Sequence, residues 1–225
     1  MSPRVLDSHR HVFVDGLRYP WLDDRVVTLG AQQHSDWSAI LVEAGAADPV
    51  AEARAMQALV NENSWVRGFI APLGLEGAER FAGIVGYRTT PDRPGGSYAY
   101  PLDLLIGAGL WTAALRVLGD ATGSVVLDHC GGGAAGSAQW CAFIEDAARH
   151  PHAYIKVSAA PSRVTAEQVL AAFGAERVMF GSDWPVSAGP DQQVSTLLGV
   201  LGAATTERDA VLAGTAERVY GVRRG

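Results

Sequence analysis

The chain has 225 residues, of which 48% are hydrophobic and 19% charged, and its formal net charge is −6. This length and composition fit a globular protein with a sizeable core, and we expect a single domain over residues 1–225. The mild negative charge argues against nucleic-acid binding. No apolar stretch approaches the roughly 20 residues that a membrane span needs, and no secretory signal is recognisable. Two cysteines, Cys130 and Cys141, are too few for a disulfide framework. We therefore expect a cytoplasmic protein that acts on a small molecule.

Runs of apolar and β-branched residues predict eight strands along the chain. In order, they are Arg4–Asp7, Ala39–Val42, Val66–Pro72, Gly83–Tyr87, Pro101–Ile106, Ser124–Asp128, Ala153–Val157 and Arg177–Phe180. Helical patterns lie between most of these runs, and several begin at a capping signal. The recognised helix starts are Asp48-Pro49 before Val50–Asn61, Ser137 before Ala138–Arg149, Thr165 with Gln168 before Ala166–Phe173, and a weaker pair, Thr206 with Asp209.

This alternation of strands and helices predicts an α/β fold with a parallel sheet. Eight units close most simply into a (β/α)8 TIM-type barrel, which normally takes about 250 residues. The outer helices look partly trimmed, because Leu73–Ala82 has room for only a short helix and Arg88–Tyr100 is rich in proline and glycine. A barrel without helices in that quarter would expose its sheet, which suggests a homodimer. An open doubly wound sheet is the alternative, although no glycine fingerprint follows the first strand.

The pentapeptide Asp7-Ser8-His9-Arg10-His11 ends the first apolar run. In an extended strand, residues two apart point to the same side, so Asp7, His9 and His11 are expected to share one face. Two imidazoles fixed at the carboxyl end of a strand can hold a metal ion or bind an anionic oxygen. A plain core strand has no use for such a pair, since buried polar rings cost free energy unless their nitrogens find partners.

Polar residues also collect at the carboxyl ends of the other predicted strands, which is where parallel barrels place their reactive groups. They are Glu43, Arg88, Asp103, Asp128 with His129, Lys156 with Ser158, and Ser182 with Asp183. His129 precedes three glycines that would let backbone approach a ligand closely. Asp183 follows a buried run and precedes Trp-Pro, and it could act as a general base or as a metal ligand.

Four further residues are candidates for binding a substrate. Arg88 suits bidentate capture of a substrate carboxylate, although an ordinary ion pair explains it equally well. Lys156 could point into the barrel or mark a sheet edge. Among the tryptophans, Trp21 and Trp184 are the two expected at the mouth of a pocket. Nucleophile and nucleotide motifs are absent from the sequence, and a thiol dyad of Cys130 with His129 is disfavoured because neighbouring strand residues face opposite sides.

Several segments together resemble the amidohydrolase-related family of the metal-dependent hydrolase superfamily, in its branch of sugar-acid and dicarboxylate lactonases. The matching segments run in family order along nearly the whole chain. They are Val5–His11, Tyr19–Leu22, Ile40–Ala44, Gly86–Arg88, Val126–His129, Ile155–Ser158 and Phe173–Pro185. The sequence departs from the family at Glu43, where the family has glutamine, at Thr89, where it has histidine, and at Cys130-Gly131-Gly132, where it has glycine, lysine and proline.

The resemblance implies a (β/α)8 barrel and hydrolysis of a small ester or lactone. It implies that His9, His11 and His129 polarise the substrate carbonyl or bind a metal, and that Asp183 takes a proton from the attacking water. His9, His11 and Asp183 would supply the two-nitrogen, one-oxygen set of a hydrolytic zinc site. The residues do not decide between one bound divalent metal and a metal-independent reaction.

Three functions remain open at this stage. The leading hypothesis is a hydrolase that opens a lactone or related cyclic ester of a small carboxylated or hydroxylated molecule. A zinc-dependent decarboxylase or other lyase of the same superfamily is the second, although the fifth strand offers Asp103 rather than histidine. A non-catalytic binding protein derived from these enzymes is the third.

Overall fold

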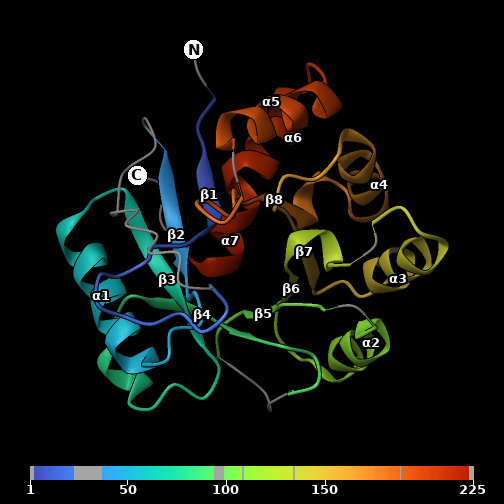
Figure 1. The fold of residues 1–225 in the computed structure, drawn as a ribbon. Coiled ribbons are helices and arrows are strands. Elements are labelled where there is room, and N and C mark those ends of the chain that lie inside the picture. Colours follow the sequence, from blue (N-terminus) through green and yellow to red (C-terminus); the bar gives the residue numbers. More distant parts are fainter. Residues whose placement is uncertain are drawn as a thin grey trace.

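A computed structural model describes residues 3–22, 37–93, 99–107, 109–133, 135–187 and 189–222. Eight parallel strands form one sheet in which each strand pairs with the next along the chain, from β1 to β8 (Figure 1). The strands are β1 Leu6–Arg10, β2 Ser38–Val42, β3 Val66–Pro72, β4 Ile84–Thr89, β5 Leu102–Leu104, β6 Val125–Leu127, β7 Ala153–Val157 and β8 Val178–Phe180.

Backbone contacts between β1 and the segment after β8 bring the two ends of the sheet together. Asp183 N donates to His9 O at 2.7 Å, and His11 N donates to Trp184 O at 2.8 Å. The eight-stranded sheet is therefore a nearly closed (β/α)8 barrel, as the sequence predicts.

Helices cover the outside of the barrel (Figure 1). They are α1 Pro49–Glu62, α2 Trp111–Asp120, α3 Ala138–Ala148, α4 Arg163–Phe173, α5 Pro190–Leu201, α6 Thr205–Asp209 and α7 Thr215–Tyr220. Between β3 and β4 there is a single 3₁₀ turn, Ala78–Arg80, and the described residues between β4 and β5 contain no helix. The trimming expected in that quarter is thus confirmed for the part of the chain that the structure describes.

The strands alternate between an outer and an inner apolar layer, as the side-chain period of two requires. In β2, Leu41 packs with Met56 of α1, whereas Ile40 and Val42 belong to an inner cluster. That inner cluster also holds Tyr220 of α7, so the last helix helps to fill the barrel interior. Among the described residues, no helix has both the length and the apolar character that crossing a bilayer requires.

Two of the expected helix caps are confirmed and two are wrong. Asp48 accepts a hydrogen bond from Ala51 N at 2.9 Å, and Ser137 accepts one from Trp140 N at 3.2 Å. Helix α4, however, begins at Arg163, because the Ser162 hydroxyl caps it one turn earlier than the proposed Thr165–Gln168 box. Helix α6 begins after Ala204 without a side-chain cap, so the Thr206–Asp209 signal is also wrong.

Candidate active site

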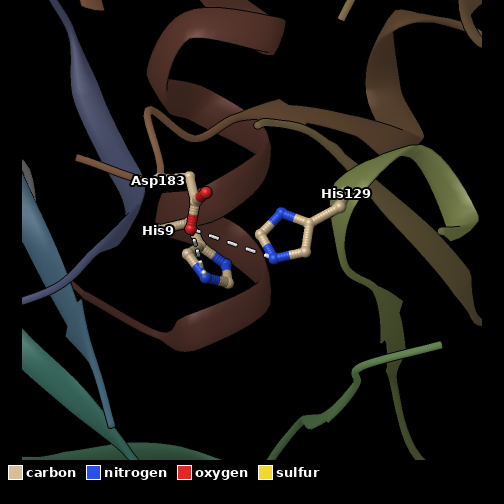
Figure 2. Close-up of side chains that lie close together, drawn as sticks. All are labelled: His9, His129 and Asp183. Carbon is tan, nitrogen blue, oxygen red and sulfur yellow. Dashed lines mark ion pairs between the residues drawn. The ribbon is translucent and has the colours of Figure 1, made fainter. Parts of the chain in front are cut away.

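The carboxyl ends of β1, β6 and β8 bring three side chains to one point of the barrel rim. Figure 2 shows His9, His129 and Asp183 pointing toward one another from these three strands. Ligand atoms of these residues lie within 4.8 Å of one another. His11 joins them, because its ring lies 5.0 Å from the His9 ring between centroids.

One carboxylate oxygen is the common centre of this group. Asp183 Oδ1 lies 3.7 Å from His9 Nε2, 3.3 Å from His11 Nε2 and 3.9 Å from His129 Nε2. The other oxygen, Oδ2, accepts a hydrogen bond from the Ser187 hydroxyl at 2.7 Å. Ser187 therefore turns the carboxylate so that Oδ1 faces the three imidazoles.

The first strand differs from its expected regular alternation. β1 extends through Arg10 instead of ending at Asp7, and its register against β2 shifts between Asp7 and Arg10. Leu6 belongs to the inner cluster, and His9 also faces inward because of this irregularity. Asp7 does not share the face of the imidazoles, so that expectation is wrong: its carboxylate accepts hydrogen bonds from Ser182 N, at 2.8 Å, and from the Ser182 hydroxyl. It ties β1 to the end of β8.

Close backbone approach at the end of β8 makes room for His9. A Cβ atom on Gly181 would lie 2.6 Å from the His9 Cβ, a distance that real Cβ atoms do not tolerate. Glycine at this position therefore lets His9 pack directly against the strand end that presents Asp183.

Two site residues adopt left-handed backbone conformations, His129 with φ of 50° and Asp183 with φ of 57°. Such conformations cost of order 1–3 kcal/mol each for residues other than glycine, and they persist only where surrounding contacts hold them. The Ser158 hydroxyl provides such contacts for His129, since it lies 3.1 Å from the backbone nitrogen and 2.9 Å from Nδ1. Both strained residues direct their side chains to the same centre.

The hydrogen bonds of the imidazoles show how their nitrogens are used. His11 Nδ1 lies 2.9 Å from Val42 O, and because a carbonyl only accepts, this nitrogen carries the proton. The other nitrogen, Nε2, lies 3.3 Å from Asp183 Oδ1, so it donates to that oxygen when it is protonated and presents a lone pair to it when it is not. His9 Nε2 is buried and has no hydrogen-bond partner among the described residues. Lone pairs facing a carboxylate repel it unless a positive charge lies between them.

This arrangement fits a divalent ion. Imidazole nitrogens and a carboxylate oxygen are ligands that zinc and related metals accept. The group that the structure brings together is His9, His129 and Asp183, with His11 beside them, whereas the sequence suggested His9, His11 and Asp183.

Burial and charge together set the protonation states of the site. Burial alone would raise the pKa of Asp183, but the hydrogen bond with His11 and the charges of His9 and His129 outweigh it and lower that pKa to about 2. Burial lowers the pKa of His9 well below its usual value and also lowers that of His129. At neutral pH Asp183 is therefore ionised, and burial favours the neutral forms of His9 and His129 beside it.

A buried ionic network lies under His9. Asp128 Oδ1 is 3.3 Å from His9 Nδ1 and 3.1 Å from Lys156 Nζ. Lys156 also pairs with Asp103, which accepts a hydrogen bond from the Tyr220 hydroxyl at 2.8 Å. Burial raises the pKa of Asp103 to about 6 even though Lys156 opposes this shift. Lys156 thus points into the barrel, where it joins β7 to β5 and β6 beneath the site.

The remaining candidates for substrate binding lie around this centre. Arg88 Nε donates to Asp128 Oδ2 at 3.0 Å, so Arg88 is engaged in an ion pair. Trp21 is half exposed, and its ring nitrogen donates to Ala44 O. Trp184 is partly buried and follows Asp183 directly, with its backbone nitrogen donating to the Ser182 hydroxyl at 3.0 Å.

Sequence reasoning gave no role to Ser187 or Tyr220, and it did not connect Ser158 with His129. The position of Ser158, two residues after Lys156, was a signal for a site residue. Tyr220 gives no local signal, since its partner Asp103 lies 117 residues away.

Comparison with known proteins assigns the family. The amidohydrolase family model matches residues 101–222, more than half of the chain. The chain belongs to the amidohydrolase family. No curated protein matches it significantly.

Solved structures match over nearly the whole chain. An amidohydrolase from Burkholderia multivorans, crystallised with HEPES, is 21% identical with a TM-score of 0.78 and covers 98% of this chain and 100% of its own. A second structure of an amidohydrolase from the same species holds zinc, at 22% identity, a TM-score of 0.76 and the same coverage. A putative 2-pyrone-4,6-dicarboxylic acid hydrolase from Pseudomonas putida is 20% identical with a TM-score of 0.67, and both chains are covered in full, 100% each. A 2,6-dihydroxybenzoate decarboxylase from Rhizobium is 14% identical with a TM-score of 0.62, covering 98% of this chain and 99% of its own. At these identities, the likeness shows the shared fold.

Proposed function

We propose that this amidohydrolase opens a lactone or related cyclic ester of a small carboxylated or hydroxylated molecule. The observation that carries the proposal is the convergence of three imidazole Nε2 atoms on Asp183 Oδ1, at 3.3–3.9 Å. A carboxylate among imidazoles, at the rim where barrel enzymes bind their substrates, suits attack of water on a polarised carbonyl.

The proposed reaction divides the work between the carboxylate and the imidazoles. Asp183 holds the attacking water and accepts its proton as the water oxygen bonds to the carbonyl carbon. Where their Nε2 atoms carry a proton, His9, His11 and His129 donate to the carbonyl oxygen, on which negative charge develops. Without that proton, the same nitrogens would instead hold a divalent ion beside that oxygen. The ring carbon–oxygen bond then breaks, and its oxygen takes up the proton that Asp183 received. The product is the open-chain hydroxy acid.

The low pKa of Asp183 has a chemical consequence. A carboxylate with a pKa of about 2 stays ionised at neutral pH, but it is a weak base toward ordinary water. His9, His129 and Asp183 are the residues that would hold a divalent ion. When bound, such an ion supplies Lewis acidity and lowers the pKa of a coordinated water to about 7.

The lyase alternative draws no specific support from the site. Asp103, the middle residue of β5, is completely buried and is engaged by Lys156 and Tyr220. It therefore does not present a ligand to the centre formed by His9, His129 and Asp183.

Acid release from a panel of neutral and carboxylated lactones, followed in a pH-stat, tests the proposal. Wild-type protein should turn over at least one lactone class, and Asp183→Asn should lower kcat by about 10²–10⁴-fold. Asp120→Asn is the matched control, because Asp120 is an exposed residue at the end of α2. Carbon dioxide release without acid production, or an Asp183→Asn rate equal to wild type, would reject the assignment.

A further inference from the structure

Glu43 lies against Arg88 at the rim of the barrel. Arg88 Nη1 is 3.4 Å from Glu43 Oε1, and it also donates to Glu43 O at 3.1 Å. The opposite side of the guanidinium donates from Nε to Asp128 Oδ2 at 3.0 Å. Arg88 is thus bracketed by two carboxylates, and its charge is compensated within the protein.

Glu43 is itself held in place. Its second oxygen, Oε2, accepts a hydrogen bond from Gly45 N at 2.7 Å, so the carboxylate is fixed between Arg88 and the backbone after β2. The Glu43 side chain is 14% exposed and that of Arg88 is 8% exposed. This pair therefore lies at the edge of the site, whereas Asp128 is completely buried beneath it.

Both charged groups that contact Arg88, Glu43 and Asp128, are negative. Glu43 and Asp183 are both acidic, and Lys156, the buried cation beneath the site, is already paired with Asp103 and Asp128. A substrate carboxylate that approached Arg88 would meet the like charge of Glu43. Building such a repulsive charge against one ligand is a common source of specificity.

We infer that Glu43 is a specificity-determining residue that directs the site to uncharged lactones by occupying Arg88. This inference rests on the proposed function, because it names the substrate class of that same site. The guanidinium remains able to donate hydrogen bonds to a neutral hydroxyl or carbonyl group. It does not supply a free positive charge to an anionic group.

The Glu43→Gln variant separates charge from shape. Glutamine has nearly the same size, and its amide oxygen can still accept the hydrogen bond from Gly45 N, but it no longer neutralises Arg88. Two probes share one cyclopentanone ring, which has no ester bond to hydrolyse, the first bearing a carboxylate and the second a carboxamide. Titration calorimetry measures the affinity ratio of the two probes for each protein, so neither outcome depends on turnover.

Wild-type protein should prefer the carboxamide. Glu43→Gln should shift the affinity ratio toward the carboxylate by about tenfold to a hundredfold, as expected for removing a like charge at close range. Adding Arg88→Met to Glu43→Gln should abolish that shift, because the guanidinium that would bind the probe carboxylate is then absent.

Glu62→Gln is the matched control, since it removes one negative charge at the exposed end of α1 and should leave the ratio unchanged. An affinity ratio in Glu43→Gln equal to that of wild type overturns the inference. So does a Glu43→Gln protein that binds neither probe. An equal shift in Glu62→Gln also overturns it, since the effect would then be one of overall charge. If the affinity ratio shifts as expected but wild-type protein turns over no lactone, that result counts against the proposed function and leaves this inference standing.

Discussion

Replacing Lys156 with methionine tests the ionic network beneath the site. The ammonium group is completely buried, and it lies between Asp103 and Asp128, 3.1 Å from the latter. Methionine fills a similar volume but leaves both aspartates buried with one partner fewer. Removing one member of a buried ion pair typically costs about 3–5 kcal/mol of unfolding free energy. We expect a loss in this range, partly reduced because Tyr220 and Arg88 still contact the aspartates.

Urea unfolding followed by circular dichroism measures this loss. For an m value of about 2.5 kcal/mol/M, a loss of about 4 kcal/mol moves the unfolding midpoint by roughly 1.6 M. Adding Asp103→Asn to Lys156→Met should restore part of the stability, since it removes one of the uncompensated charges. Arg163→Met is the control, because its ion pair with Glu167 is exposed and should contribute less than about 1 kcal/mol. A Lys156→Met protein as stable as wild type would refute the reasoning.

Three further predictions follow from single contacts. Burial raises the pKa of Glu52 from 4.5 to about 7. Between these pH values the folded protein keeps a proton that the unfolded chain has lost, so the free energy of unfolding falls as pH rises. Glu52→Gln should remove about 3 kcal/mol of this pH dependence in urea unfolding, and the same dependence of unfolding free energy on pH in both proteins would contradict it. Gly181→Ala should lose about 1–3 kcal/mol of unfolding free energy in the same assay, because its Cβ would overlap His9, and an unchanged midpoint would show that the strand end adjusts. Ser187→Ala should lower kcat for a turned-over lactone by roughly tenfold, the equivalent of about one hydrogen bond orienting Asp183, and unchanged kcat would remove Ser187 from the site.

The alternation of apolar runs and helical patterns along the sequence was sufficient to predict the barrel. The apolar run Val66–Pro72, for example, predicts a strand with the same bounds that the structure gives. The carboxyl ends of parallel strands meet at one rim, so the separate positions of His9, His129 and Asp183 in the chain imply one location in space. The structure places their ligand atoms within 4.8 Å of one another.

Other features depend on contacts that no local pattern encodes. The irregular register of β1 reverses the expected face of Asp7, and only the contact with Ser182 shows why the strand tolerates this carboxylate. The sequence leaves Arg88 open between binding an anion and forming an ordinary ion pair, and its pairing with Glu43 appears only when the ends of β2 and β4 are brought together.

Isotope labelling of the reaction water tests the central claim most directly. A lactone that the protein turns over is incubated in water enriched in heavy oxygen, and the product is analysed by mass spectrometry. Attack of a water activated at Asp183 predicts a hydroxy acid with one labelled oxygen in its new carboxylate and no release of carbon dioxide. An unlabelled product, or loss of carbon dioxide from the substrate, would contradict the hydrolytic role of the site.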